Sequence, residues 1–559
     1  MRREVSVVNK KVCSFPILFA LLALLIGTCA VVFPASAQAA PTSTGSITVS
    51  GTVASSYDAY QIFSANVVDG DSDAKIATDL TWASDAARDA VLPVLHSAGM
   101  PNSQTTAQEA AEWLNTDSHL TSALSAQLAR SLQNSGAVSV ALNAGTEAKL
   151  PCGYWLIVAD DDAIAQNEAG TAPIMALVGG SAVTVKPKAA TPKVSKHVLE
   201  DSTDAWQKAA DATVADDLYW RLSATVPAGL TAYDTYTVQF VDTMSAGLDP
   251  SKVASSMRVY VAAGADGGFD AVQTGKDGRA GAEPAKGWTD ITAQCATKVA
   301  ADGKTFTVRT GDLIAALGGA DAFTAGARVV AVYNAPLNSA CNHGIAKGNH
   351  NEVYLRYPRS PFADQSGDAG FTRTPSDDAC AYTWDLVLTK RGSDGDKPLA
   401  GAVLSIADDR GRTLAADGTW DAEGKATVTT GEDGRVTVSG MDSGKLEVRE
   451  LKAPKGYTAF EGTRSVTVKA EGLDVDQVAA AKPKLTITAE SPLRADSADG
   501  STGSLEASLI NTPANVPPRG FMPSTGDMAM YAAAAAAVAG AALIVVALLV
   551  KRGGGSHKE

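Results

Sequence analysis

Three polar residues in the last third of the chain stand where strand alternation would bury them. Lys390, Glu450 and Asn511 each follow apolar residues at a spacing of two, and residues two apart on a β-strand point to the same face. Burying an amine, a carboxyl and a carboxamide without compensation costs several kcal/mol. The apolar residues that would share their faces are Leu386, Leu388, Leu446, Val448 and Leu509.

Condensation of these groups would remove that cost. Burial lowers the pKa of an amine and raises the pKa of a carboxyl. A neutral Lys390 amine can attack the carboxamide carbon of Asn511, while a protonated Glu450 polarises the carbonyl and passes a proton to the leaving ammonia. The packed core would hold the groups at attack distance, which supplies the rate. An uncondensed hydrogen-bond cluster and three solvated strand-end residues are the alternatives.

The elements that would position these groups are strands. The chain has 559 residues and 50 glycines, and short segments alternate apolar and polar residues between turns. The exception is residues 79–137, which are rich in Ala and Leu at helical spacing and predict two or three helices. We therefore predict a mainly β fold of tandem immunoglobulin-like β-sandwich domains, with helices inserted in the N-terminal domain and a C-terminal transmembrane helix.

Proline-containing linkers divide the chain, at residues 187–192, 358–361 and 513–518. Each of the three segments between the two termini is long enough for one hydrophobic core. The predicted parts are a signal peptide (1–39), an N-terminal domain (40–188), a middle domain (189–365), a third domain (366–515) and a sorting signal with its membrane helix (516–559).

The N-terminus has the three parts of a secretion signal. A basic start with Arg2 and Arg3 precedes an apolar segment at residues 15–33, and small residues follow at 35–39. This order is typical of a signal peptide that is removed on export. A retained membrane anchor is the alternative.

A pentapeptide precedes an apolar run near the C-terminus, and it consists of Met522, Pro523, Ser524, Thr525 and Gly526. The run, residues 529–550, is long enough to span a bilayer as a helix and is followed by basic residues. The pentapeptide resembles the LPxTG sorting signal of Gram-positive surface proteins, with Met522 in the Leu position. This resemblance implies that a sortase cysteine attacks the Thr525 carbonyl and that an amine resolves the thioester. An ordinary membrane anchor is the alternative.

The segments around Lys390, Glu450 and Asn511 resemble the collagen-adhesin B-type domain of Gram-positive surface proteins. Such domains commonly form an intramolecular Lys–Asn isopeptide bond, which here implies a bond between Lys390 and Asn511 with Glu450 as the acid. The Glu450 segment resembles the E-box of pilins, with Leu451 where Thr is usual. The matching segments are residues 382–390, 398–404, 434–440, 446–457 and 505–511.

A second set of residues resembles the middle domain of three-domain pilins, over residues 192–198, 236–248 and 351–357. The resemblance implies a bond between Lys196 and Asn351, with Asp242 as the acid. Lys196 is preferred to Lys193 because valines alternate with it onto one face. Asn349 lies on the same face as Asn351 and remains a competitor for the role of electrophile.

The first domain resembles the N-terminal domain of the same pilins, over residues 57–63, 153–158 and 183–188. In the pilin motif of that family, Lys188 would be the lysine that sortase uses for polymerisation. Lys186 stands where the motif has Tyr, and Ala189 stands where it has Asn. An ordinary linker lysine is the alternative reading of Lys188.

Four cysteines lie outside the predicted signal, namely Cys152, Cys295, Cys341 and Cys380. An exported protein permits disulfides, and we predict a Cys295–Cys341 pair because both residues lie in one predicted domain. The stretch that holds Cys341, His343, His350 and Glu352 could suggest a metal site, but the resemblance assigns it to the end of a sandwich. We therefore predict no metal and no cofactor.

The net charge of −14 excludes a nucleic-acid partner, because a phosphate-binding surface needs clustered Lys and Arg. The resemblance, which covers nearly the whole chain, implies the major shaft subunit of a wall-anchored pilus that serves adhesion. The implied partners are sortase, neighbouring pilin subunits, peptidoglycan, and a host receptor or matrix protein that the sequence does not name. The alternatives are a minor pilin at the tip or base, a monomeric wall-anchored adhesin, and a wall-anchored enzyme, against which the lack of a catalytic constellation argues.

Overall fold

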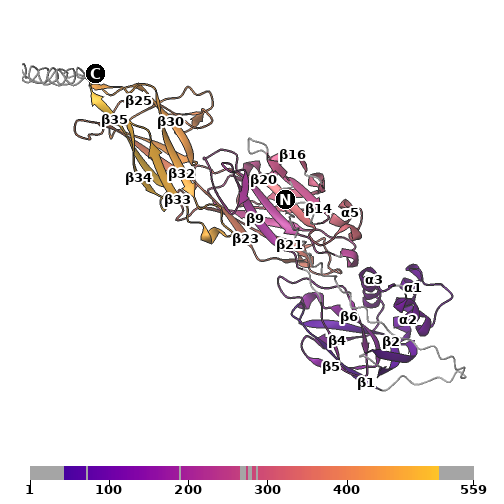
Figure 1. Ribbon diagram of the computed structural model, residues 1–559. Coiled ribbons are helices and arrows are strands. Elements are labelled where there is room, and N and C mark those ends of the chain that lie inside the picture. Colours follow the sequence, from indigo (N-terminus) through magenta and orange to yellow (C-terminus); the bar gives the residue numbers. More distant parts are fainter. Residues whose placement is uncertain are drawn as a thin grey trace, which may run out of the picture.

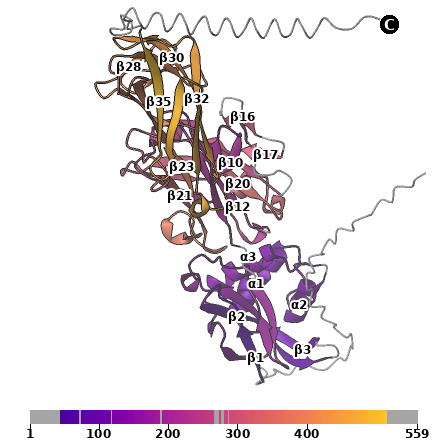
Figure 2. The same ribbon diagram turned by 60° about the vertical axis from the view of Figure 1, so that its left-hand side comes forward.

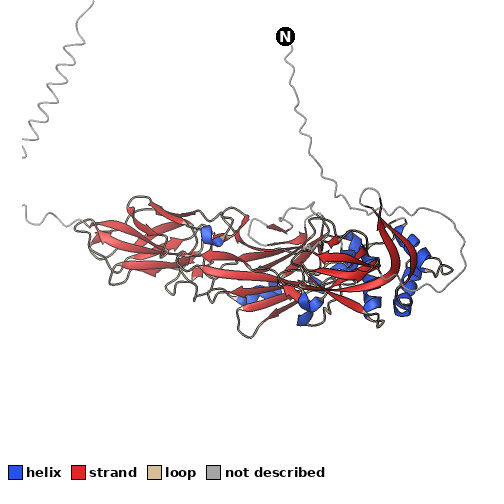
Figure 3. Cartoon of the chain, turned by 90° about the horizontal axis from the view of Figure 1, so that it is seen from below, coloured by secondary structure: helices blue, strands red, loops and turns tan. Residues whose placement is uncertain are grey.

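The computed structural model describes residues 43–70, 74–116, 118–187, 191–228, 230–264, 272–274, 280–284 and 287–514. Strands dominate, and the sheets fall into three modules that follow one another along an elongated molecule (Figures 1 and 3). We call them the N-terminal module (residues 43–187), the middle module (191–382) and the C-terminal module (384–514). The predicted mainly β, modular organisation is confirmed. Within the described ranges, no helix has the length and hydropathy of a membrane span.

The N-terminal module contains two sheets and three helices. One sheet has the order β3-β2-β6-β7 with β4 beside β2, and the other has the order β5-β1-β8. The strands are β1 Thr44–Val49, β2 Ser56–Asp69, β3 Lys75–Trp82, β4 Ser139–Asn143, β5 Glu147–Pro151, β6 Gly153–Ala159, β7 Ile174–Val178 and β8 Val183–Val185. The helices are α1 Asp85–Ser97, α2 Ala107–Asn115 and α3 Ser122–Gln133.

Local sequence explains these helices, which confirm the expectation for residues 79–137. Ser84, Thr106 and Thr121 cap the three N-termini with side-chain oxygens, and Thr106 forms a full capping box with Glu109. Helix α3 lies at the end of the module that faces the middle module (Figure 2). Its Arg130 donates to the carbonyls of Ala232 and Pro361 there.

The middle module has two large sheets with an apolar core between them and a separate two-stranded sheet of β15 and β16. The sheets have the orders β10-β9-β12-β20-β14-β17 and β11-β23-β21-β13-β19-β18, with β22 beside β21. The strands are β9 Val194–Glu200, β10 Ala205–Gln207, β11 Ala209–Asp211, β12 Tyr219–Thr225, β13 Gln239–Met244, β14 Arg258–Ala262, β15 Val272–Thr274, β16 Ala280–Pro284, β17 Trp288–Asp290, β18 Ala296–Val299, β19 Thr305–Arg309, β20 Arg328–Asn334, β21 Asn349–Pro358, β22 Phe371–Arg373 and β23 Asp377–Tyr382. Two short helices, α4 Val253–Ser256 and α5 Leu313–Ala316, join strands at its edges.

Strand pairing extends this module beyond the predicted boundary at residue 365. Both β22 and β23 are antiparallel partners of β21, and β11 pairs in parallel with β23. The proline-containing linker at residues 358–361 is thus followed by two further strands of the same sheet. Tyr382 is the last strand residue of the middle module, because β24 begins at Trp384 in another sheet.

The C-terminal module also has two sheets around one core. Their orders are β29-β24-β35-β31 with β34 beside β35, and β27-β26-β25-β30-β32-β33 with β28 beside β25. The strands are β24 Trp384–Gly392, β25 Val403–Ala407, β26 Thr413–Leu414, β27 Trp420–Asp421, β28 Val428–Thr429, β29 Arg435–Met441, β30 Gly444–Lys452, β31 Tyr457–Thr458, β32 Thr463–Glu471, β33 Lys484–Ala489, β34 Leu493–Asp499 and β35 Ser504–Pro513. The first strand, β24, and the last, β35, are parallel neighbours.

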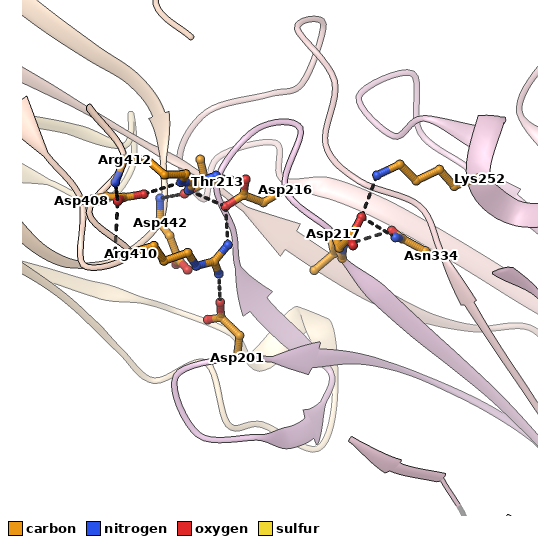
Figure 4. Close-up of polar contacts among 11 residues, drawn as sticks. Asp201, Thr213, Asp216, Asp217, Lys252, Asn334, Asp408, Arg410, Arg412 and Asp442 are labelled. Carbon is orange, nitrogen blue, oxygen red and sulfur yellow. Dashed lines mark hydrogen bonds and ion pairs between the residues drawn. The ribbon is translucent and has the colours of Figure 1, made fainter. Parts of the chain in front are cut away.

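The middle and C-terminal modules meet through charged and buried polar contacts (Figure 4). Arg412 binds both carboxylate oxygens of Asp216, at 2.5 and 2.8 Å. Arg410 bridges Asp216 and Asp201, at 2.8 and 2.9 Å. The indole of Trp384, the first residue of β24, donates to Asp211 of the middle module at 2.6 Å. Planar guanidinium groups suit such paired contacts, which fix the register of one module on the other.

Several carboxyl groups lie close to one another at this contact between the modules. Burial, followed by the nearby Asp211, raises the pKa of Glu200 to about 7. Burial and the neighbouring carboxyls of Asp211, Asp201 and Glu200 hold the pKa of Asp442 well above its usual range. Such groups keep a proton in the folded protein that they release on unfolding.

The junction should therefore lose stability as these carboxyls ionise. The folded protein binds more protons than the unfolded chain between pH 4.5 and about 7 at Glu200, so this contribution to stability falls as pH rises through that window. The Asp442→Asn substitution keeps the buried group neutral and leaves no proton to be released on unfolding. It should raise the unfolding temperature more at pH 8 than at pH 4.5, by about 2–4 °C for each kcal/mol gained. Asp409→Asn, at an exposed neighbour, is the control for calorimetry, and an equal gain from Asp442→Asn at both pH values would contradict the prediction.

Candidate cross-linking sites

Adjacent strands of one sheet hold the amine and the carboxamide of the C-terminal module. Lys390 on β24 pairs with Leu509 on β35, two residues before Asn511, so both polar side chains lie on the same face. Glu450 lies on β30 of the opposite sheet. The side chains of all three meet in the core, with residue exposures of 0% for Lys390, 6% for Glu450 and 2% for Asn511.

Glu450 joins the two other groups. Its Oε1 lies 3.5 Å from Lys390 Nζ, and its two oxygens accept from Asn511 Nδ2 at 2.9 and 3.0 Å. The backbone N–H of Phe460 also donates to Glu450 Oε2, at 3.1 Å, and fixes the carboxyl. The predicted residues are thus brought together at hydrogen-bond distance.

Two features of this cluster favour nucleophilic attack. Burial lowers the pKa of Lys390 to about 8, which places a sizeable fraction of neutral amine near neutral pH. Asn511 Oδ1 is buried and has no hydrogen-bond partner within the described residues. Rotation of the carboxamide by half a turn would bring this oxygen onto Glu450, where a protonated carboxyl could polarise it.

The middle module assembles the same three group types in a different arrangement. Lys196 on β9 lies in one sheet, while Asp242 on β13 and Asn351 on β21 lie in the other. Asp242 pairs with Val353, two residues from Asn351, so acid and carboxamide share a face. All three polar residues are 0% exposed, and Lys196 forms an ion pair with Asp242.

Burial again shifts the ionisation of these groups toward the reactive forms. It lowers the pKa of Lys196 to about 8, against the opposing effect of the Asp242 charge. Burial also raises the pKa of Asp242, although Lys196 counteracts it. Asn351 Oδ1 is buried without a hydrogen-bond partner in the part of the chain that is described, as Asn511 Oδ1 is.

Tyr333 on β20 is a fourth member of the middle cluster that the sequence analysis did not find. Its hydroxyl accepts from Lys196 Nζ at 2.9 Å and from Asn351 Nδ2 at 2.8 Å, and it donates to Asp242 at 3.0 Å. The Phe306 ring packs edge-on against the Tyr333 ring, with centroids 4.8 Å apart. One hydroxyl therefore connects the amine, the acid and the carboxamide.

The competing residues of the middle module have other roles. Lys193 is exposed to solvent. Asn349 is buried, but its Nδ2 donates to the carbonyls of Asn342 and Ala381, and its Oδ1 accepts from Asn342 N–H. A carboxamide held by three backbone contacts stabilises its loop, so the geometry favours Asn351 as the partner of Lys196.

The remaining predicted residues have different outcomes. The predicted Cys295–Cys341 disulfide is wrong in this structure, since all four described cysteines are free. The Cys295 thiol donates to Ile291 O at 3.3 Å, whereas the Cys341 thiol contacts His343. Among the described residues, no group of three His, Cys, Asp or Glu side chains could hold a metal.

Several predictions fall outside the described residues. They concern the signal peptide (1–39), the acceptor lysine Lys188 and the apolar run at 529–550. They also concern the sorting pentapeptide, Met522, Pro523, Ser524, Thr525 and Gly526. Lys186 and Pro187 are described, and Lys186 is exposed directly after β8.

Comparison with known proteins identifies part of the chain. Residues 385–482, a segment that contains Lys390 and Glu450, match the family model of the SpaA prealbumin-like fold domain. The chain is also similar to the trypsin-resistant surface T6 protein of Streptococcus pyogenes serotype M6, with 28% identity over 143 residues. This match spans 24% of the chain and 24% of that relative, about a quarter of its length.

Solved structures of pilins resemble the chain over most of its length. The T6 backbone pilin of serotype M6 Streptococcus pyogenes is 16% identical over 84% of this chain and 98% of its own, with a TM-score of 0.46. The full-length major pilin SpaD of Corynebacterium diphtheriae is 15% identical over 85% and 100%, with a TM-score of 0.42. The family-model match and the streptococcal relative confirm the expected resemblance to Gram-positive pilins.

Tyr333→Phe tests the part of the middle cluster that the structure adds. Removing the hydroxyl takes one partner each from Lys196, Asp242 and Asn351, and should slow the condensation of Lys196 with Asn351 by about tenfold or more. Intact mass of freshly folded protein measures the fraction that has lost ammonia. Tyr260→Phe is the matched control, because the buried Tyr260 hydroxyl on neighbouring β14 has no partner within the described residues. Equal rates in the two variants would contradict a role for Tyr333.

Proposed function

We propose that this protein is the shaft subunit of a covalently polymerised, sortase-assembled pilus on a Gram-positive cell surface. The single observation that carries the proposal is the recurrence, in two successive β-modules, of a fully buried Lys beside an acid and an Asn. The SpaA-family match over residues 385–482 and the similarity to a streptococcal surface protein support it. The function is structural and adhesive, and the chain acts as a substrate of sortase and not as an enzyme.

In the proposed chemistry, the middle and C-terminal modules each make one isopeptide bond without any cofactor. The neutral amine of Lys390 attacks the carboxamide carbon of Asn511, and Glu450 transfers the proton that allows ammonia to leave. In the middle module, Lys196 attacks Asn351, with Asp242 as the acid. Glu450 contacts both its amine and its carboxamide, which supports its role. Asp242 contacts Lys196 directly and is connected to Asn351 through the Tyr333 hydroxyl.

Such bonds would suit a fibre under tension. A cross-link between residues far apart in sequence limits the freedom of the unfolded chain, as a disulfide does, and a loop of about 100 residues corresponds to roughly 4.7 kcal/mol. An amide has no redox chemistry comparable to a disulfide, so the link persists in reducing surroundings. The covalent chain then carries load from β24 to β35, the first and last strands of the C-terminal module, and from β9 to β21 in the middle module.

The partners follow from this assembly. Sortase would join Thr525 of one subunit to Lys188 of the next, and the terminal subunit would be joined to peptidoglycan. The chain would consist of a signal peptide (1–39), three modules and a sorting signal (516–559). The pilus would adhere to a host receptor or matrix protein. A minor pilin or a monomeric wall-anchored adhesin would share the sorting signal but would form no ladder of linked subunits.

The internal bonds have a direct mass signature. Residues 40–515, expressed alone, should weigh less than the sequence mass by two ammonia molecules, one for each bond. Glu450→Ala should abolish the Lys390–Asn511 bond and restore one ammonia, while the middle-module bond still forms, and Asp242→Ala should do the reverse. A measured mass equal to the full sequence mass would contradict the two proposed isopeptide bonds, but it would not test the sorting signal.

Polymerisation distinguishes a shaft subunit from the other surface proteins. Lys188 follows Pro187, which fixes the backbone and holds the preceding residue extended. Lys188→Arg should give secreted, folded monomer and no high-mass ladder on a denaturing gel of wall extracts. Lys186→Arg and Lys193→Arg are matched controls, since both lysines are exposed nearby and should allow normal ladders. If all three variants polymerise, the acceptor lies elsewhere; if the wild type makes no ladder, the shaft function is wrong.

A further inference from the structure

A cysteine, a histidine and an aspartate lie in line where the middle and C-terminal modules meet. Cys341 Sγ is 3.6 Å from His343 Nε2, and His343 Nδ1 is 2.8 Å from Asp385 Oδ2. Cys341 and His343 belong to the loop between β20 and β21, whereas Asp385 is the second residue of β24. Neither cross-linking cluster uses these three residues.

Asp385 determines which imidazole nitrogen carries the proton. Its other oxygen, Oδ1, accepts from Ser439 Oγ at 2.7 Å and from Gly440 N–H at 2.9 Å, which fixes the carboxylate. A carboxylate only accepts hydrogen bonds, so it selects the tautomer with the proton on Nδ1. The lone pair of His343 Nε2 then faces the Cys341 thiol.

The surroundings of the thiol exclude acyl transfer as its chemistry. An acyl intermediate needs backbone N–H donors that stabilise an oxyanion. The N–H of Cys341 already donates to Asn338 O at 3.1 Å, and the N–H of Asn342 donates to Asn349 Oδ1 at 2.8 Å. Thiol–disulfide exchange needs no oxyanion site; it needs a nucleophilic sulfur, a base and a proton for the leaving thiolate.

We propose that Cys341 is a modification site that exchanges with small disulfides, with His343 as its base and Asp385 as the residue that positions the base. His343 Nε2 takes the thiol proton as Cys341 Sγ attacks one sulfur of the disulfide. The new Sγ–S bond forms as the disulfide bond breaks, and the imidazolium returns the proton to the leaving thiolate. The products are a mixed disulfide on Cys341 and one free small thiol, so the reaction needs no further oxidant.

The reactant must be small, because Cys341 is only 9% exposed. Because Asp385 belongs to another module than Cys341 and His343, the base is oriented only while the two modules are docked. The Cys341 thiol would therefore be most reactive while the middle and C-terminal modules are docked. This property does not depend on the proposed pilus function.

The chain contains its own control thiol. Burial raises the pKa of both Cys341 and Cys295 to about 11, so neither thiol is favoured by a lowered pKa. Cys295 is more exposed than Cys341, but its thiol donates to the carbonyl of Ile291. The greater exposure of Cys295 favours its reaction with a disulfide. If Cys341 nevertheless reacts faster, the difference is due to His343 acting as its base. The fully buried Cys152 and Cys380 react only if the protein unfolds.

The test is the rate at which oxidised glutathione modifies each cysteine of the purified full-length protein at pH 7.5, followed by peptide mass mapping. Cys341 should react at least about tenfold faster than Cys295. In Asp385→Asn, the amide N–H faces His343 Nδ1 and turns the imidazole to the other tautomer, while its carbonyl still accepts from Ser439 and Gly440. This variant should slow Cys341 by about tenfold or more, with Cys295 unchanged.

Labelling of the buried Cys152 or Cys380 would show that Asp385→Asn disturbs the contact between the middle and C-terminal modules. In that case His343→Gln provides the test of the base. In His343→Gln, Cys341 should react no faster than Cys295. A wild-type Cys341 that reacts no faster than Cys295, or that keeps its rate in both folded variants, would overturn the proposal. A Cys295–Cys341 disulfide in the purified protein would do the same.

Discussion

A lysine amine held at the centre of an apolar core is the constraint on which the middle and C-terminal modules depend. An isolated ammonium in such surroundings is so unfavourable that the group must be paired, neutralised or converted. In the middle module, Lys196 lies over the rings of Trp220 and Tyr333, 5.5 and 5.4 Å from their centroids, and is paired with Asp242. In the C-terminal module, Lys390 has Glu450 and the Leu509 carbonyl as its partners. Each core therefore contains an amine whose burial would be unfavourable without its polar partners.

The two modules meet this constraint with opposite geometry. In the C-terminal module the amine and the carboxamide share a sheet and the acid reaches across the core, whereas in the middle module the acid and the carboxamide share a sheet and the amine reaches across. The second arrangement places Asp242 on the same face of one sheet as Asn351, and Tyr333 from the lysine's sheet connects all three groups. In the C-terminal module, the two oxygens of Glu450 contact Asn511 directly.

Strand alternation could predict that Lys390, Glu450 and Asn511 point inward, and it favoured Lys196 over Lys193. The roles of Asp242 and Asn351 came from the resemblance to three-domain pilins. Alternation left Asn349 open as a competitor of Asn351. It could not find Tyr333, because a tyrosine at the end of an apolar strand looks like any core aromatic residue; only the opposite sheet reveals what its hydroxyl meets. Strands β22 and β23 were missed as parts of the middle module because a proline-containing stretch precedes them, and pairing across a sheet leaves no local signal. The disulfide failed for a similar reason, since membership of one domain says nothing about how far apart two thiols lie.

In the proposed fibre, the attachment points determine which modules bear load. Tension would enter a subunit at Lys188, shortly before Lys196, and leave at Thr525, shortly after Asn511. Between them, the force would pass from Lys196 to Asn351 and from Lys390 to Asn511 through covalent bonds, bypassing the noncovalent sandwiches. Because β24 and β35 are parallel neighbours, pulling on their opposite ends would shear the two strands along their length, and a bond between them blocks that movement. The N-terminal module, which ends at residue 187, would lie outside this path. Its described part has no fully buried lysine, as expected of a module that carries no tension and therefore needs only the stability of its own packing.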